Sequence, residues 1–149
     1  MTRRYGDIPD PARRYRRRPG VYAILPRDGH ILLTFQAAPL PEYQLPGGGI
    51  DAGENPVTAL HREVFEETGW HIASPKRLGF YRRFTFMSEY DLWAEKICQV
   101  WIARPTLEIG PPVEPDHTPL WAEPDEALAL IGNEGERDFM HRVFRDLGW

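Results

Sequence analysis

The stretch that decides the fold is residues 48–70, GGIDAGENPVTALHREVFEETGW. Asn55 and Pro56 predict the start of a helix, because asparagine is a favourable N-cap and proline fits the first helical position. Gly69 predicts its end, because glycine readily adopts the left-handed conformation that closes many helices. The stretch therefore predicts a helix over 56–68, preceded by a glycine-rich segment whose backbone can approach a ligand closely.

One face of this helix carries three glutamates. At 100° per residue, Glu63, Glu66 and Glu67 fall within an arc of about 100°, and Arg62 is spaced to pair with Glu66. Like charges at these spacings destabilise a helix by a few tenths of a kcal/mol per pair. A hard divalent cation would remove the repulsion and would also bind the phosphate oxygens of a substrate. The alternative interpretation is a solvated acidic surface.

The spacing around the acidic face separates these two interpretations. Gly48 is followed after five residues by Glu54, and seven further residues lead to Arg-Glu-Val-Phe-Glu-Glu-Thr-Gly-Trp over 62–70. This pattern resembles the Nudix box, all seven fixed positions of which are matched. The last position of the box is commonly aliphatic, and here it is Trp70.

The resemblance implies an α/β fold, the Nudix fold, which is an α/β/α sandwich with a central mixed β-sheet. It also implies hydrolysis of a nucleoside diphosphate linked to another moiety, with Mg²⁺ or Mn²⁺ as cofactor. By position in the box, Glu63, Glu66 and Glu67 are then the metal-binding and catalytic carboxylates. Gly48 is then a carbonyl ligand of the metal.

The same resemblance implies supporting roles for two further residues of the box. Arg62 and Glu54 match the pair that orients the catalytic helix in the family. The general base stays open between Glu63 and a glutamate of a late loop. Glu114 is the candidate for that late glutamate and for a further metal ligand.

The remainder of the chain predicts a single α/β domain. Residues 27–29, Arg-Asp-Gly, predict a tight hairpin turn, and residues 106–119 hold four prolines and predict a functional loop. The predicted strands cover 21–26, 30–36, 78–86 and 97–103, with a further short strand over 118–122; the predicted helices beyond the box cover 125–131 and 134–147.

The amino-acid composition indicates the class of protein and the cellular compartment in which we expect it. The chain has 149 residues, of which 42% are hydrophobic and 27% charged, as in an ordinary globular domain. The only cysteine, Cys98, allows neither an internal disulfide nor a thiolate zinc site, so we expect a cytoplasmic protein. We expect no association with membranes, and a monomer or a homodimer.

The first residues are strongly basic. Residues 1–20 hold seven arginines and two aspartates, a local net charge of +5 in a chain whose net charge is −4. We expect residues 1–18 to form a basic N-terminal arm and residues 19–149 a single domain; no apolar run follows the arginines, so we expect no secretion signal. The arm is either a landing site for polyphosphate or RNA, with Tyr5 and Tyr15 stacking on bases, or a solvated terminus. The solvated terminus is favoured, so RNA is a possible partner but not the favoured one.

Signatures of the coenzyme A, NADH and ADP-ribose branches of the family are absent. The substrate expected from this elimination is a nucleotide, most simply a (d)NTP or a modified dNTP, cleaved to a monophosphate and pyrophosphate. The alternatives are a dinucleoside polyphosphate, a nucleotide sugar or the 5′ end of RNA. A non-catalytic Nudix domain that binds nucleotides or RNA is the alternative from another class.

Four residues outside the box are candidates for substrate binding. Tyr43 precedes the glycine turn and could stack on a base. Asn133 either reads a base edge or caps the last helix, in a capping-box-like pair with the glutamate three residues later. Arg27 and Arg82 are candidate phosphate contacts, since Gln36 stands where many members of the family carry an arginine.

Overall fold

The computed structural model describes residues 2–149. No helix among these residues is long and apolar enough to span a membrane. The elements are β1 (Arg3–Gly6), β2 (Arg16–Ile24), β3 (Pro26–Arg27), β4 (His30–Gln36), β5 (Glu42–Gln44), β6 (Gly47–Gly49), α1 (Pro56–Thr68), β7 (Trp70–Met87), β8 (Leu92–Glu108), β9 (His117–Ala122), α2 (Pro124–Leu130) and α3 (Glu134–Leu147), with a 3₁₀ turn over Ser88–Tyr90.

The predicted mixed sheet is confirmed, and it is accompanied by a second sheet. The mixed sheet has the order β1-β7-β8-β2-β6, in which β1 runs parallel to β7 and β2 parallel to β8. The second sheet is antiparallel and consists of β3, β4, β5 and β9, with β9 paired to β4. The division into two sheets was not predicted from the sequence.

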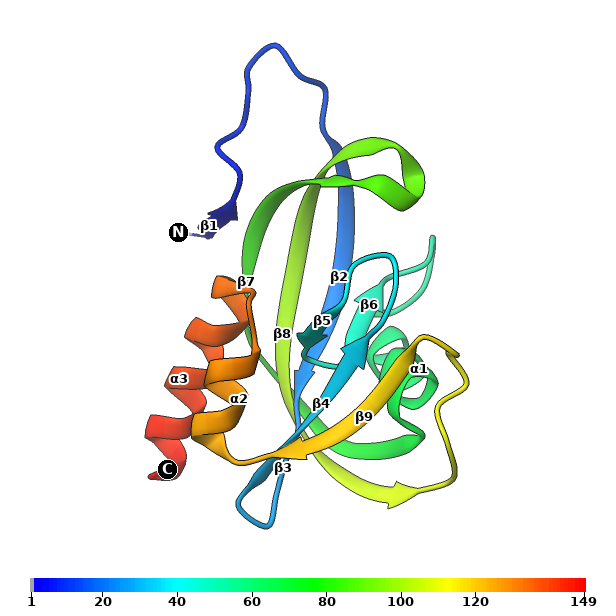
Figure 1. The fold of residues 1–149 in the computed structure, drawn as a ribbon, viewed down its shortest axis with the longest axis vertical. Coiled ribbons are helices and arrows are strands. Elements are labelled where there is room, and N and C mark those ends of the chain that lie inside the picture. Colours follow the sequence, from blue (N-terminus) through cyan, green and yellow to red (C-terminus); the bar gives the residue numbers. More distant parts are fainter. Residues whose placement is uncertain (1) are drawn as a thin grey trace.

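The helices lie on opposite sides of the sheets, as expected for an α/β/α sandwich (Figure 1). Strand β2 contributes to both layers, because its successive side chains point to opposite faces. Val21 and Ala23 pack in the cluster that contains Leu60 of α1, whereas Tyr22 and Ile24 pack in the cluster that contains α2 and α3 residues. Strand β4 divides in the same way.

Helix α1 has the predicted bounds, and the predicted signals set both of them. The Asn55 side chain accepts a hydrogen bond of 2.8 Å from the Val57 backbone N–H. Gly69 has φ 78°, and its N–H donates to the Phe65 carbonyl at 2.8 Å. A Cβ at Gly69 would also clash with the Gly110 carbonyl oxygen, so the site requires glycine for two reasons.

Two predicted strands are longer in the structure. They are β7 (Trp70–Met87) and β8 (Leu92–Glu108), which were predicted over 78–86 and 97–103 only. The β7–β8 ladder shifts register between Ala73 and Lys76, so that Pro75 lies in an irregularity of the strand where no ladder hydrogen bond is needed. The hairpin at Arg27 is confirmed, although it joins β3 to β4; Asp28 and Gly29 both have positive φ, which suits a tight two-residue turn.

The segment expected to be an arm takes part in the sheet at both of its ends. Residues 3–6 pair with 81–84 of β7, and residues 16–18 are the first residues of β2, paired with 94–96 of β8. The Tyr5 hydroxyl hydrogen-bonds the Asp138 carboxylate of α3, and the Tyr15 ring packs edge-on against Phe84. The arginine-rich residues 3–6 and 16–18 have no local pattern typical of a strand. They become strands because they pair with β7 and β8, which are distant in the sequence. The two tyrosines are engaged in packing within the protein.

Candidate active site

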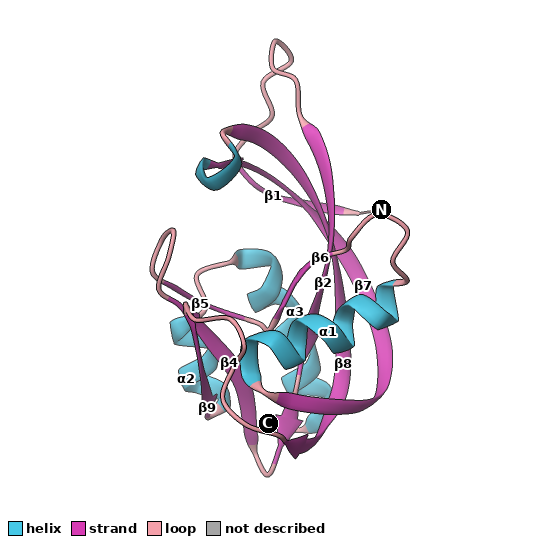
Figure 2. Ribbon diagram, turned by 90° about the vertical axis from the view of Figure 1, so that its right-hand side faces the viewer, coloured by secondary structure: helices cyan, strands magenta, loops and turns pink. Residues whose placement is uncertain are grey.

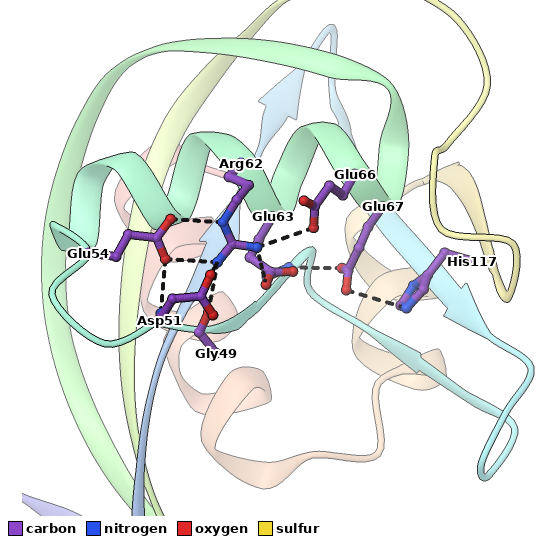
Figure 3. A network of polar contacts seen from close by, with 9 residues as sticks. Gly49, Asp51, Glu54, Arg62, Glu63, Glu66, Glu67 and His117 are labelled. Carbon is purple, nitrogen blue, oxygen red and sulfur yellow. Dashed lines mark hydrogen bonds and ion pairs between the residues drawn. The ribbon is translucent and has the colours of Figure 1, made fainter. Parts of the chain in front are cut away.

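Arg62 organises the acidic face of α1 (Figure 3). Its guanidinium binds Glu54 through two hydrogen bonds, of 2.8 Å from Nε and 2.9 Å from Nη2. Nη1 donates to Glu63 at 2.9 Å and to Glu66 at 3.2 Å, and Nη2 also reaches the Gly49 carbonyl at 3.1 Å. One guanidinium therefore joins α1 to the segment before it and fixes two carboxylates.

Two of the carboxylates bound by Arg62, those of Glu54 and Glu63, have pKa values shifted in opposite directions. Hydrogen bonds from Arg62 hold the pKa of the Glu54 carboxyl down at about 2. Burial raises the pKa of Glu63, and this effect outweighs the hydrogen bond from Arg62, while the negative charges of Glu66 and Glu114 raise it further. Glu54 therefore stays ionised beside Arg62, whereas Glu63 binds a proton more readily than a free glutamate.

Glu67 is buried at the end of the same face. Its Oε1 accepts a 3.0 Å hydrogen bond from the Gly47 N–H, and its Oε2 lies 3.4 Å from Nε2 of His117. The other ring nitrogen of His117 lies 3.0 Å from the Thr34 hydroxyl. Burial raises the pKa of Glu67 well above its usual range, and burial lowers that of His117. Residues of α1, β4, β6 and β9 meet at this point.

Two backbone segments border the acidic face. A Cβ at Gly48 would lie 2.5 Å from an oxygen of Glu63, so no larger residue fits where β6 crosses the carboxylates. On the other side, the Glu114 N–H donates to the Glu66 carbonyl at 2.9 Å, which fixes the proline-rich loop at the end of α1. The predicted ligands Gly48, Glu63, Glu66, Glu67 and Glu114 are therefore gathered around one end of one helix.

This donor set fits a hard divalent cation, since carboxylate and carbonyl oxygens are the ligands such ions prefer. Within residues 2–149, no group of three His, Cys, Asp or Glu side chains has the arrangement of a metal site in this conformation. Glu63 and Glu66 turn toward Arg62, whereas Glu67 turns toward Gly47 and His117. The assignment of these residues as metal ligands stays a prediction.

Glu136 is a residue that sequence analysis did not single out for the site. It is 2% exposed, and its carboxylate accepts a 3.3 Å hydrogen bond from the Leu45 N–H. Glu67 holds Gly47, two residues further along, so two buried glutamates from opposite helical layers hold one segment. Burial raises the pKa of Glu136 to about 8. Its place in the last helix suggested only a cap.

The last helix begins as predicted, with a correction to its cap. Asn133 accepts a 3.1 Å hydrogen bond from the Glu136 N–H and is therefore the N-cap of α3. The side chain of Glu136 does not complete a capping box, because it points to Leu45. Tyr43 lies close by, since it forms a β-bridge with Ile131, and its ring packs against Phe35 at 4.9 Å between centroids. Base binding by Tyr43 and Asn133 stays a prediction.

The structure does not bring the two predicted phosphate-binding arginines to the acidic face. Arg27 lies in the β3–β4 hairpin with its guanidinium 5.0 Å from the centroid of Trp70, beside a pocket of about 360 Å³. Arg82 pairs with Glu95 at 3.3 Å, between β7 and β8. Neither makes a hydrogen bond or ion pair with the glutamates of α1 among the described residues.

Part of the chain is similar in sequence to proteins of known name. A putative 8-oxo-dGTP diphosphatase of Bacillus subtilis is 34% identical over 74 residues, which are 50% of each chain. An RNA pyrophosphohydrolase of Cereibacter sphaeroides is 41% identical over 92 residues, 56% of this chain and 55% of the relative. The chain thus spans about half the length of the curated relatives that it matches.

The structural comparison covers more of the chain. A MutT NUDIX hydrolase from Burkholderia pseudomallei superposes with a TM-score of 0.70 at 26% identity, over 86% of this chain and 98% of that one. A NUDIX hydrolase from Nitrosomonas europaea shares the fold, with a TM-score of 0.71 at 17% identity over 88% and 90% of the two chains. The family described as the NUDIX domain matches residues 14–143, nearly the whole chain, and this protein therefore belongs to the Nudix family.

Proposed function

We propose that this protein is a divalent-metal-dependent hydrolase that cleaves a phosphoanhydride bond of a nucleotide, with a (d)NTP or a modified dNTP as its best substrate. The observation that carries the proposal is the ordering of the acidic face by Arg62 and Glu54. An acidic surface without a function has no need of a bidentate arginine that holds two of its carboxylates at fixed positions.

Mg²⁺ or Mn²⁺ would be held by the Glu63, Glu66, Glu67 and Glu114 carboxylates and the Gly48 carbonyl. When bound, the cation would neutralise phosphate oxygens and lower the pKa of a water molecule. Arg62 and Glu54 are positioning residues, because they fix α1 relative to Gly49 rather than face the substrate. Glu67 anchors the glycine segment through Gly47.

The proton of the attacking water needs an acceptor among these carboxylates. Glu63 suits this role, since burial raises its pKa and makes it a better proton acceptor than a free glutamate. Glu114 is the second candidate, because the Glu66 backbone holds its loop at the end of α1. The pH profiles of Glu63→Gln and Glu114→Gln distinguish the two, as only loss of the base removes the acidic limb.

The test is hydrolysis of a nucleotide panel with Mg²⁺, with Mn²⁺ and with a chelator. The panel contains (d)NTPs, 8-oxo-dGTP, ADP-ribose, dinucleoside polyphosphates, nucleotide sugars and RNA with a 5′-triphosphate. We expect the highest kcat/KM for a triphosphate, no turnover with the chelator, and, in ¹⁸O-water, label on one phosphorus only. Turnover that survives chelation would contradict the metal dependence, and a protein that binds nucleotides without turnover would be a regulator.

A second candidate function is removal of pyrophosphate from the 5′ end of RNA. The name of the Cereibacter sphaeroides relative favours it, although that relative matches only in part. We also propose that the protein acts in the cytoplasm as a monomer or homodimer. The buried thiol of Cys98, the only cysteine, fits a reducing compartment.

A further inference from the structure

A second charged region, this one positive, lies at the end of the mixed sheet that α1 does not cover. It is formed where β2 begins, β7 ends and β8 begins. Figure 2 shows that α1 lies across the lower part of the sheet, while β2, β7 and β8 continue above it. We call this region the arginine surface. It consists of Arg13, Arg14, Arg16, Arg17, Arg18 and Arg82, with the aromatic residues Tyr15, Tyr90 and Trp93.

Several arginines of this surface are held by aromatic rings. The Arg13 guanidinium lies 3.7 Å from the Trp93 ring centroid, and that of Arg18 lies 4.6 Å from the centroid of Tyr90. A guanidinium stacked in this way is fixed in orientation, while the N–H groups in its plane stay available to a phosphate. Such arginines are prepared to bind phosphates.

The arginine surface has an excess of positive charge that the protein itself does not neutralise. Among residues 2–149, no ion pair involves Arg13, Arg14, Arg16 or Arg18. Arg17 and Arg82 share one carboxylate, that of Glu95, and the Arg17 side chain is 80% exposed. Outside residues 1–20 the chain carries a net charge of −9, so a polyanion is attracted to this end and repelled elsewhere.

A hollow is present between the strand ends. It has a volume of about 680 Å³ and is lined by Arg14, Tyr15, Arg16, Arg17, Asp91, Leu92 and Trp93. Tyr90 at its side is 56% exposed, which leaves an aromatic ring at the surface for a base to stack on. Unpaired bases can reach such a ring, whereas stacked base pairs of a duplex cannot.

One strand joins the hollow to the candidate active site. Val21 of β2 pairs with Gly48 of the glycine segment, and Arg17 lies on the same face of β2 four residues earlier. At about 3.3 Å per residue, the two positions are about 13 Å apart, the length of two or three nucleotides of an extended strand. A chain of phosphates could therefore reach from the acidic face to Arg17, at the border of the hollow, whereas Arg16 and Arg18 point to the opposite face of β2.

We propose that the arginine surface binds single-stranded RNA. The strand crosses the hollow at the strand ends, with its phosphates on the exposed arginines of this surface and a base on Tyr90. Its 5′ end points toward the acidic face, along the face of β2 that carries Arg17. The binding rests on the arginines and aromatic rings alone; only the direction of the strand rests on the proposed function.

The test measures binding of a short, fluorescent single-stranded RNA with a 5′-hydroxyl end by anisotropy, in the absence of divalent cations. No hydrolysis occurs under these conditions, so the result is independent of the proposed function. Arg14→Glu/Arg16→Glu is the test variant, because neither side chain makes an ion pair within the described part of the chain. Arg104→Glu/Arg145→Glu is the matched control, since both arginines are exposed and the change in net charge is identical.

We expect the test variant to weaken the Kd by about tenfold and to reduce the slope of log K against log salt by about 0.7 per lost phosphate contact, with the control unchanged. Equal loss in both variants would show attraction by net charge alone and overturn the proposal. Equally tight binding of double-stranded RNA, or of vesicles of anionic lipid, would overturn it as well. If the protein bound single-stranded RNA but hydrolysed no triphosphate, the proposed function would be contradicted, and the proposal of RNA binding by the arginine surface would still hold.

Discussion

The acidic face of α1 and the arginine surface are both clusters of like charge, but the protein treats them in opposite ways. Each buried or half-buried glutamate has a defined partner, such as Arg62 for Glu63 or Gly47 for Glu67. The arginines are largely exposed, Arg13 and Arg18 lie on aromatic rings, and Glu95 is the one carboxylate within the described residues that pairs with any of them. Fixed oxygen donors suit a small ion that demands geometry, whereas exposed cations suit a long polyanion that adapts to them.

The largest effect is expected at the acidic face. Glu63→Gln, Glu66→Gln or Glu67→Gln removes a charged oxygen ligand or the base and should lower kcat by on the order of 10²–10⁴-fold. Thermal stability of Glu67→Gln should be equal or higher, because this side chain is buried and its pKa is raised, so its neutral form is favoured. Turnover and melting temperature check both statements. Glu108→Gln, a change at an exposed glutamate, is the control. Full activity in all three test variants would contradict the assignment of the acidic face as the catalytic region.

The next effect tests whether geometry or charge matters at Arg62. Lysine keeps the charge but cannot make the two parallel hydrogen bonds to Glu54 while also holding Glu63 and Glu66. We expect Arg62→Lys to lower metal affinity and kcat by about 10–100-fold, as for residues that orient metal ligands. Isothermal titration with Mn²⁺ measures the first quantity. If lysine restored wild-type values, charge alone would be sufficient.

A pH effect is expected at Glu136, a buried carboxyl whose burial outweighs the attraction of Lys96 and Arg83. Its pKa is raised by burial from an ordinary value of 4.5 to about 8 in the folded protein, so the folded state holds this proton more tightly than the unfolded state. Its contribution to stability is complete below pH 4.5 and is lost as the pH rises toward 8, by about 1.4 kcal/mol per pH unit. Glu136→Gln should flatten the melting temperature between these limits, unlike the exposed Glu134→Gln.

The smallest effect is expected where the basic N-terminal segment meets α3. Tyr5→Phe removes the hydrogen bond to Asp138 and should cost about 1 kcal/mol of unfolding free energy. Because Tyr5 lies at the edge of the sheet away from the acidic face, kcat for a triphosphate should not change. Urea denaturation measures the loss. A large decrease in kcat would mean that the two regions are coupled.

Local signals in the sequence predicted the elements that carry the candidate site. Asn55, Pro56 and Gly69 set the bounds of α1 through hydrogen bonds within a few residues, which a sequence displays directly. The spacing of Arg62 and Glu66 predicted their ion pair, which is 3.2 Å long. Here the local preferences and the fold agree.

Long-range contacts could not be predicted in this way. Strand β1 forms because β7 offers an edge some eighty residues away, and its own sequence, Arg-Arg-Tyr-Gly, has no strand pattern. Glu136 follows Asn133 at capping-box spacing, yet its carboxylate meets Leu45 from a distant part of the chain. In both cases the partner, and not the local pattern, decides the outcome.

The alternation of β2 between the two apolar clusters has a consequence for how the molecule opens. Ala23 belongs to the cluster under α1 and Ile24 to the cluster under α3, so neither helix layer can separate without exposing side chains of this one strand. We therefore expect cooperative unfolding in a single transition, without a partly open form that retains one layer. The backbone amides of β2 between Val21 and Ile24 should exchange with solvent only by global unfolding, which makes them natural reporters of the total stability in hydrogen-exchange measurements.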